Sequence, residues 1–146
     1  MKIIFLTVGK KGGITDDAVS EYVKRLQKYI SVERVILPNS NKKKENETIA
    51  KHLSDEDFVV ALDEKGKGLS TLELAKFLEG KMISGEKKII FVIGGAYGLD
   101  ESIIKRADMI WSLSKLTFPH EIAWIVLAES VYRAFTVIKG ESYHHA

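Results

Sequence analysis

The sequence predicts an α/β fold in which a mostly parallel sheet is flanked by helices. Two observations lead to this class: five β-rich runs alternate with helical stretches, and each run is almost continuously apolar. Strands with apolar residues on both sides are typical of sheets that are covered on both faces. The predicted strands span residues 3–8, 32–37, 58–62, 89–93 and 109–113.

Periodicity and capping signals predict the first helices. Residues 15–30 carry one apolar stripe and two acidic residues near the positive end of the helix dipole, which predicts an amphipathic cover helix. Ser70 and Glu73 stand at capping-box spacing at the start of another helix. Asp100 is a suitable cap for a short helix through Lys105.

The last helix is predicted to begin near Pro119 and to end before Gly140. A helix that only covers a sheet needs one apolar stripe, whereas this one is apolar nearly all round. We therefore expect it to bury a second face, most simply against another copy of the chain in a homodimer. A central core helix is the alternative. The clearly polar residues between positions 122 and 138 are Glu129, Ser130, Arg133 and Thr136.

Composition bounds the class of protein. A chain of 146 residues is expected to form a single domain over residues 1–146. With no cysteine and four scattered histidines, no metal site is expected. The net charge of +2 identifies no partner. Since neither a run of about 18 apolar residues nor a signal-peptide pattern is present, we expect no membrane association and a cytoplasmic location.

The polar stretch PNSNKKKENE, residues 38–47, is interpreted as a solvated loop. Its lysines, Lys42, Lys43 and Lys44, allow an alternative. Lysines on a mobile loop can neutralise an RNA backbone without reading its sequence.

Three irregular segments follow the third, fourth and fifth predicted strands. FVIGGAYGLD places Gly94, Gly95 and Gly98 between a strand and a helix, which fits a tight turn as well as a ligand-binding loop. LDEKGKGLS follows the third strand and SLSKLTFPH follows the fifth. Because ligands of open parallel sheets bind beyond the carboxyl ends of strands, the three segments together predict a pocket.

The C-terminal segment ESYHHA carries Tyr143, His144 and His145 after the capping glycine. It is either a disordered end or a segment that folds over a nucleobase by stacking and hydrogen bonding. Glu129 and Arg133, four residues apart on the last helix, predict an ion pair that is buried, bridged by solvent or functional.

In FVIGGAYGL, SLSKLTFPH and LAESVYRAFTVIKGESYH, and in register at MKIIFLTVGK, the sequence resembles the RlmH family of SPOUT-class methyltransferases. Members of this family methylate N3 of a pseudouridine in 23S ribosomal RNA. The resemblance covers essentially the whole chain. It implies a deep trefoil knot in the last third of the sheet, S-adenosylmethionine bound in the knot loops, an obligate homodimer and a substrate within the assembled ribosome.

The chemistry of this methyl transfer leads to hypotheses on the roles of individual residues. His144 would accept the proton that leaves the ring nitrogen, Tyr143 would stack on or orient the base, and Arg133 would bind a phosphate or steady the developing charge. The family commonly has arginine where this chain has Trp124 and a lysine or arginine where it has His145, so we do not carry the family's substrate contacts over to these two positions. The implied cofactor site comprises Leu62, Gly94, Leu113, Ser114, Lys115, Leu116, Thr117 and Phe118.

Two other functions fit the sequence. A doubly wound protein that binds a nucleotide or phosphate would rest on GGAYG alone. Calorimetry that compares S-adenosylmethionine with ATP and flavin mononucleotide separates it from a methyltransferase. A non-catalytic RNA-binding dimer would instead bind RNA and leave it unmethylated.

Overall fold

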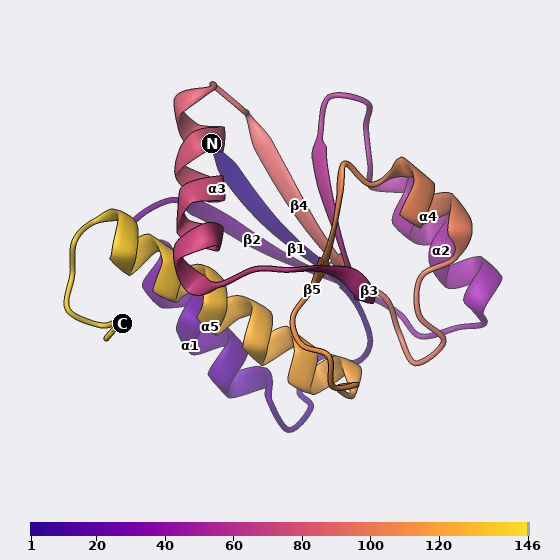
Figure 1. Cartoon of the computed structure of the whole chain (residues 1–146). Helices are drawn as coiled ribbons and strands as arrows, with labels where there is room; N and C mark the ends of the chain where they lie inside the picture. The colour runs from indigo at the N-terminus through magenta and orange to yellow at the C-terminus, as the bar shows by residue number, and fades with distance from the viewer. Residues whose placement is uncertain (146) are drawn as a thin grey trace.

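A computed structural model describes residues 1–145 and confirms an α/β fold on one five-stranded sheet (Figure 1). All neighbouring strands are parallel, in the order β2-β1-β4-β3-β5. The strands are β1 (Lys2–Val8), β2 (Ser31–Leu37), β3 (Phe58–Gly68), β4 (Lys88–Ile93) and β5 (Met109–Ser112). The helices are α1 (Asp16–Leu26), α2 (Lys42–Lys51), α3 (Thr71–Ile83), α4 (Glu101–Arg106) and α5 (His120–Ile138).

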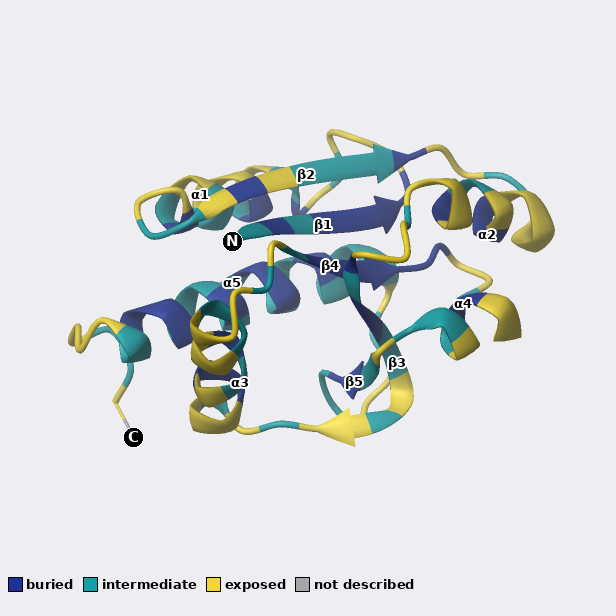
Figure 2. Cartoon of the chain, turned by 90° about the horizontal axis from the view of Figure 1, so that it is seen from above, coloured by how far each residue is buried: buried dark blue, intermediate teal, exposed yellow. Residues whose placement is uncertain are grey.

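The sheet separates a large and a small hydrophobic core. Along β1, Ile3 and Phe5 belong to the large core, whereas Leu6 and Val8 belong to the small one, as the alternation of side chains along a strand requires. Helix α5 contacts both α1 and α3 over the large core, and α2 lies beside α4 over the small one (Figures 1 and 2). The central strands are consequently buried on both faces.

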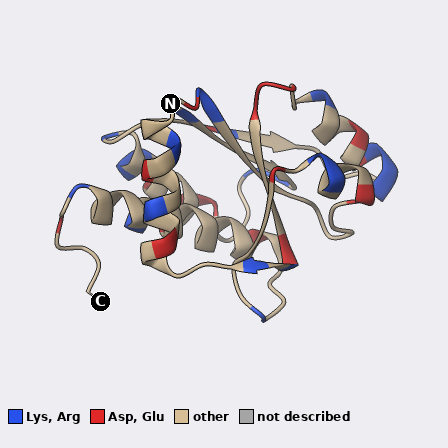
Figure 3. Ribbon diagram, turned by 45° about the horizontal axis from the view of Figure 1, so that its top comes forward, with Lys and Arg blue, Asp and Glu red and all other residues tan. Residues whose placement is uncertain are grey.

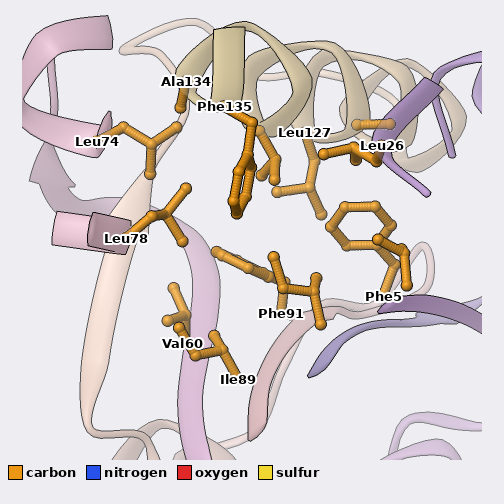
Figure 4. Close-up of a cluster of buried hydrophobic side chains, with 14 of the residues drawn as sticks. Phe5, Leu26, Val60, Leu74, Leu78, Ile89, Phe91, Leu127, Ala134 and Phe135 are labelled. Atoms are coloured by element: carbon orange, nitrogen blue, oxygen red, sulfur yellow. The ribbon is translucent and has the colours of Figure 1, made fainter. Parts of the chain in front are cut away.

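Aromatic rings fill the large core (Figure 4). Phe91 from β4 is fully buried, and its ring centroid lies 5.9 Å from that of Phe5 and 6.1 Å from that of Trp111. Phe135 of α5 is also fully buried and stacks on Tyr29 at a centroid distance of 6.2 Å. Helix α5 is therefore held on the sheet by packing along its inner face.

The capping predictions are confirmed. Ser70 and Glu73 form a reciprocal capping box at the start of α3, and the Asp100 carboxylate accepts the Ile103 N–H at the start of α4. Helix α5 ends just before Gly140, whose φ of +68° is the left-handed conformation that glycine adopts readily.

The solvated loop predicted for residues 38–47 is wrong for most of that stretch. Helix α2 begins at Lys42, and the Asn41 side chain caps it by accepting the Lys44 N–H at 2.8 Å. The inner face of the helix carries Glu45, Asn46 and Ile49, all buried. Of these three buried residues only one is apolar, and they follow a run of lysines. A search for regularly spaced apolar residues therefore does not detect this helix face.

Strand β3 extends to Gly68, past its predicted end at residue 62. Leu62 and Lys67 both pair with Trp111 of β5, so the chain bulges outward between them. A bulge of this kind redirects side chains at the edge of a sheet. The segment after the predicted third strand is therefore a bulge within β3 and not a free loop.

Most of the apolar surface of α5 is covered within the chain, because α1 and α3 flank it on the sheet. The central core helix therefore accounts for much of the pattern that pointed to a homodimer. Ile122 and Val126 differ, since they are partly exposed and lie outside the core. The buried residues of α5 are Trp124, Leu127, Ala128, Val131, Ala134, Phe135 and Thr136.

Within residues 1–145, no helix is long and apolar enough to cross a membrane.

Replacing Phe135 by Ala should lower the free energy of unfolding by about 3–5 kcal/mol, because the buried ring would leave a cavity that rigid neighbours cannot fill. Unfolding in denaturant measures this loss. Ile83→Ala is the control: that side chain is 81% exposed, so its loss should change stability by less than about 0.5 kcal/mol. A Phe135→Ala protein as stable as the parent would contradict the packing of α5 on the sheet.

Candidate functional site

A cavity of about 560 Å³ opens at the carboxyl edge of the sheet. The start of the bulge in β3 and the segments that follow β4 and β5 converge on it, and the first turn of α5 closes one side. These are the three segments predicted to converge, although the first of them lies within β3. Seven of the eight predicted cofactor residues line it, and the eighth, Lys115, does not. The cavity is also lined by residues not singled out beforehand as cofactor ligands: Asp63, Glu64, Ile93, Gly95, Ala96, Tyr97, Gly98, Leu99, Pro119, His120 and Ala123.

The segment after β5 is held in shape by its own hydroxyl groups. The Ser112 hydroxyl donates to the Ser114 carbonyl at 2.8 Å, and the Ser114 hydroxyl oxygen accepts the Leu116 N–H at 3.0 Å. The Thr117 hydroxyl donates to the Glu64 carboxylate at 2.6 Å and so ties this segment to the bulge of β3. Two sides of the cavity are therefore fixed to each other.

Apolar side chains stand exposed around the cavity. Tyr97 is 62% exposed and Leu116 is 70% exposed, and both line it. Exposed apolar groups beside a concave site are typical of a surface that a ligand covers.

The glycine segment after β4 needs glycine for its own turn. The Gly98 N–H donates to the Gly95 carbonyl at 3.0 Å, and Gly98 has a φ of +77°. A Cβ added at Gly94 would lie 2.8 Å from the Gly98 carbonyl carbon, closer than real contacts allow. The tight turn predicted for GGAYG is therefore confirmed, and the same segment is a wall of the cavity.

Helix α2 also holds this turn in place. The Asn46 side chain, 1% exposed, donates to the Gly98 carbonyl at 3.3 Å and accepts the Asp100 N–H at 2.9 Å. Next to it, the Glu45 carboxylate packs so close to Gly95 that an added Cβ would lie 2.8 Å from Oε1. Sequence reasoning missed both residues because they stand within the polar, lysine-rich stretch.

The three predicted catalytic residues meet in a second cluster at the C-terminal end of α5. The Arg133 Nη2 lies 2.7 Å from the Glu129 carboxylate, which confirms the predicted ion pair, and this contact raises the pKa of Arg133. The Arg133 guanidinium lies 4.6 Å from the Tyr143 ring centroid, and its Nη1 lies 3.3 Å from His144 Nδ1. Burial, with Tyr22 and Glu129 nearby, raises the pKa of Tyr143, so its hydroxyl is protonated at neutral pH.

The C-terminal segment packs against α1 and α5. The Tyr29 hydroxyl donates to the Glu141 carboxylate at 2.6 Å, a bond that raises the pKa of Tyr29 to about 12. The Tyr143 ring lies 4.8 Å from that of Tyr132, edge to face. Residues 141–145 thus lie against the protein surface, with His145 exposed, and Ala146 lies outside the described residues.

The first turn of α5 lines the cavity, whereas the C-terminal cluster lies near the other end of this helix. Figure 1 shows the course of α5 between these two ends. At about 1.5 Å per residue, His120 at the cavity and Arg133 in the cluster are roughly 20 Å apart along the helix axis. Within one chain, the cavity residues and the tail residues therefore do not form a single site.

Trp124, one of the two departures noted in the sequence, lies between the cavity wall and an arginine from another element. Its ring is 5.4 Å from that of His120, which lines the cavity. On the other side the Arg34 guanidinium of β2 lies 5.4 Å from the indole and bonds Asp16 at 2.6 Å. An arginine thus lies beside position 124 although position 124 is not itself arginine.

Lysine and arginine side chains gather on two neighbouring helices. Lys42, Lys43 and Lys44 are exposed on α2, and Lys105 and Arg106 lie on the neighbouring α4 (Figure 3). Over residues 1–145, no three His, Asp or Glu side chains are grouped so that they could hold a metal ion.

Comparison with known proteins gives full-length matches. A family model described as "Predicted SPOUT methyltransferase" matches residues 1–144. A protein of Christiangramia forsetii is 41% identical, one of Clostridium botulinum (strain Okra) is 40% identical and one of Parabacteroides distasonis is 38% identical. In each case the match covers 99% of both chains, and each relative is named ribosomal RNA large subunit methyltransferase H.

Replacing Asn46 by Asp should loosen the glycine turn, because a carboxylate would face the Gly98 carbonyl in place of a donor. Loss of a buried hydrogen bond with a carbonyl left unpaired should cost about 1–3 kcal/mol of stability. Chymotryptic cleavage after the exposed Tyr97 should become faster, which reports on the turn itself. Glu47→Gln, on the exposed face of the same helix, is the control. Equal cleavage of all three proteins would show that Asn46 does not hold the turn.

Proposed function

This chain belongs to the SPOUT methyltransferase family, and on that basis we propose that it methylates large-subunit ribosomal RNA, at N3 of a pseudouridine in the 23S molecule. The observation that carries this proposal is the end-to-end similarity to three relatives named ribosomal RNA large subunit methyltransferase H. The pseudouridine and its N3 atom are what the family resemblance implies. The assembled ribosome is the proposed substrate, and the cytoplasm is the location that this substrate implies. The trefoil knot that the family resemblance implies stays a prediction.

The proposed methyl donor is S-adenosylmethionine, bound in the cavity at the carboxyl edge of the sheet. A volume of about 560 Å³ is in the usual range for small-molecule sites, and walls of glycine backbone and apolar side chains suit a flat adenine ring. Asp63 and Glu64 at the cavity supply acceptors for the hydroxyl and ammonium groups of such a ligand. The sulfonium supplies an electrophilic methyl group, which the protein must align with the attacking nitrogen.

We propose a homodimer because the cavity is separated from the C-terminal cluster in one chain. Two copies with antiparallel α5 helices would bring the C-terminal segment of each chain to the cavity of the other. Ile122 and Val126, apolar and partly exposed on the outer side of α5, supply a surface for this contact. The tail residues Tyr143 and His144 would then act in trans on a base held beside the partner's cofactor.

In the decisive experiment, ribosomes that lack the modification are incubated with the protein and labelled S-adenosylmethionine, and the labelled nucleotide is then mapped. Label at a pseudouridine of 23S ribosomal RNA is the expected result. Ribosome binding without incorporation of label would instead favour the non-catalytic RNA-binding dimer.

Gly94→Val should weaken binding of S-adenosylmethionine by at least about tenfold, because a branched side chain at this position would force the turn away from Gly98. Calorimetry measures the affinity, and circular dichroism checks that the variant is folded. Gly80→Ala is the control, since a Cβ at Gly80 would meet nothing within 4 Å. Unchanged affinity in folded Gly94→Val protein would place the cofactor elsewhere.

Mixing two inactive variants tests the dimer and the exchange of tails. In heterodimers of Gly94→Val with His144→Ala, one site would combine an intact cavity with an intact tail. After subunit exchange, an equal mixture should recover about a quarter of the parent activity, since half of the dimers would hold one intact site of two. Sedimentation of each variant shows whether it dimerises. No recovery in a mixture that does form heterodimers would assign each tail to its own chain.

A further inference from the structure

The contact between Arg133 and His144 determines which ring nitrogen of the histidine carries hydrogen. Arg133 Nη1 lies 3.3 Å from His144 Nδ1 in hydrogen-bonding geometry. A guanidinium has five N–H donors and no acceptor, so the imidazole nitrogen that faces it must be the acceptor. In the neutral ring, the hydrogen then belongs to Nε2.

Arg133 is itself held in place, which makes this contact specific. Its Nε and Nη2 both bond the Glu129 carboxylate, at 2.8 Å and 2.7 Å, and its face lies against the Tyr143 ring. The Tyr143 hydroxyl donates to the same carboxylate at 3.2 Å. Of the nitrogens of Arg133, Nη1 is therefore the one directed at His144, and the guanidinium is engaged inside the cluster.

Nδ1 of His144 therefore accepts the hydrogen bond from Arg133. In an imidazolium, by contrast, an N–H on Nδ1 would face an N–H of Arg133. We propose that His144 acts on the substrate as a hydrogen-bond donor through Nε2–H, in place of the general-base role expected from the sequence. Arg133 is then the positioning residue that fixes the donor tautomer. This inference rests on the proposed function.

The chemistry balances without a protein base. The N3–H of the pseudouridine loses its proton to solvent hydroxide, which becomes water, and the negative charge spreads over the two carbonyl oxygens beside N3. Nε2–H of His144 donates to one of these oxygens and stabilises the anion. The N3 lone pair then forms a bond to the methyl carbon while the carbon–sulfur bond breaks and leaves a neutral thioether. His144 keeps its hydrogen throughout.

Two substitutions at position 144 separate a donor from a base. The side-chain amide of Gln can present an N–H near the position of Nε2–H, but it is not a base at neutral pH. In single-turnover methylation of ribosomes, His144→Ala should lose about 10²-fold or more, whereas His144→Gln should stay within about tenfold of the parent. A His144→Gln protein as slow as His144→Ala, with an intact fold and cofactor affinity, would overturn the donor role.

The tautomer can be measured without any substrate, so its test is independent of the proposed function. In long-range ¹H–¹⁵N NMR spectra at pH 8, His144 of the full-length protein should show an unprotonated Nδ1 and a protonated Nε2. Arg133→Met should abolish this preference and slow methylation to the same degree as His144→Ala. Lys139→Met, an exposed cation near the end of the same helix, should change neither. Hydrogen on Nδ1 in the parent protein would overturn the inference even if methylation is confirmed.

Discussion

Helix α5 must bury its inner face against the sheet while α1 and α3 hold its flanks, and both parts of the proposed site depend on this burial. Trp124 near its first turn and Phe135 near its last are 2% and 0% exposed, so neither end is free to shift. The first turn is a wall of the cavity, and the last turns carry Arg133 and the segment that follows. One rigid helix therefore sets the separation that a second copy of the chain would have to bridge.

The sheet and most helix ends could be predicted because each depends on local physical chemistry. Runs such as Ile89–Ile93 are apolar on both sides and read as buried strands, and Ser70 with Glu73 satisfies the first amides of a helix. The position of the cavity followed from the direction of parallel strands alone. Helix α2 could not be found in this way, since its buried side chains Glu45 and Asn46 are polar, and Asn46 bonds the backbone of Gly98 and Asp100, far away in sequence.

The long-range arrangement of the tail lay beyond sequence reasoning for a different reason. Arg133, Tyr143 and His144 were each expected to act on the substrate, and the structure brings the three into one cluster. Their separation from the cavity depends on the length and direction of α5 relative to the sheet, which no local pattern encodes. The roles of individual atoms, such as Nδ1 of His144, depend in turn on contacts that only coordinates supply.

The placement of the two tryptophans gives the protein an intrinsic optical probe. Trp111 and Trp124 are 3% and 2% exposed, so their emission should be blue-shifted in the folded chain and move to longer wavelength on unfolding. Trp124 also contacts His120, a residue of the cavity wall, whereas Trp111 packs on Phe91 inside the large core. Quenching of the Trp124 emission alone would then report on occupancy of the cavity. A change in the emission of both tryptophans would report on the integrity of the fold, so one titration without a label gives both results.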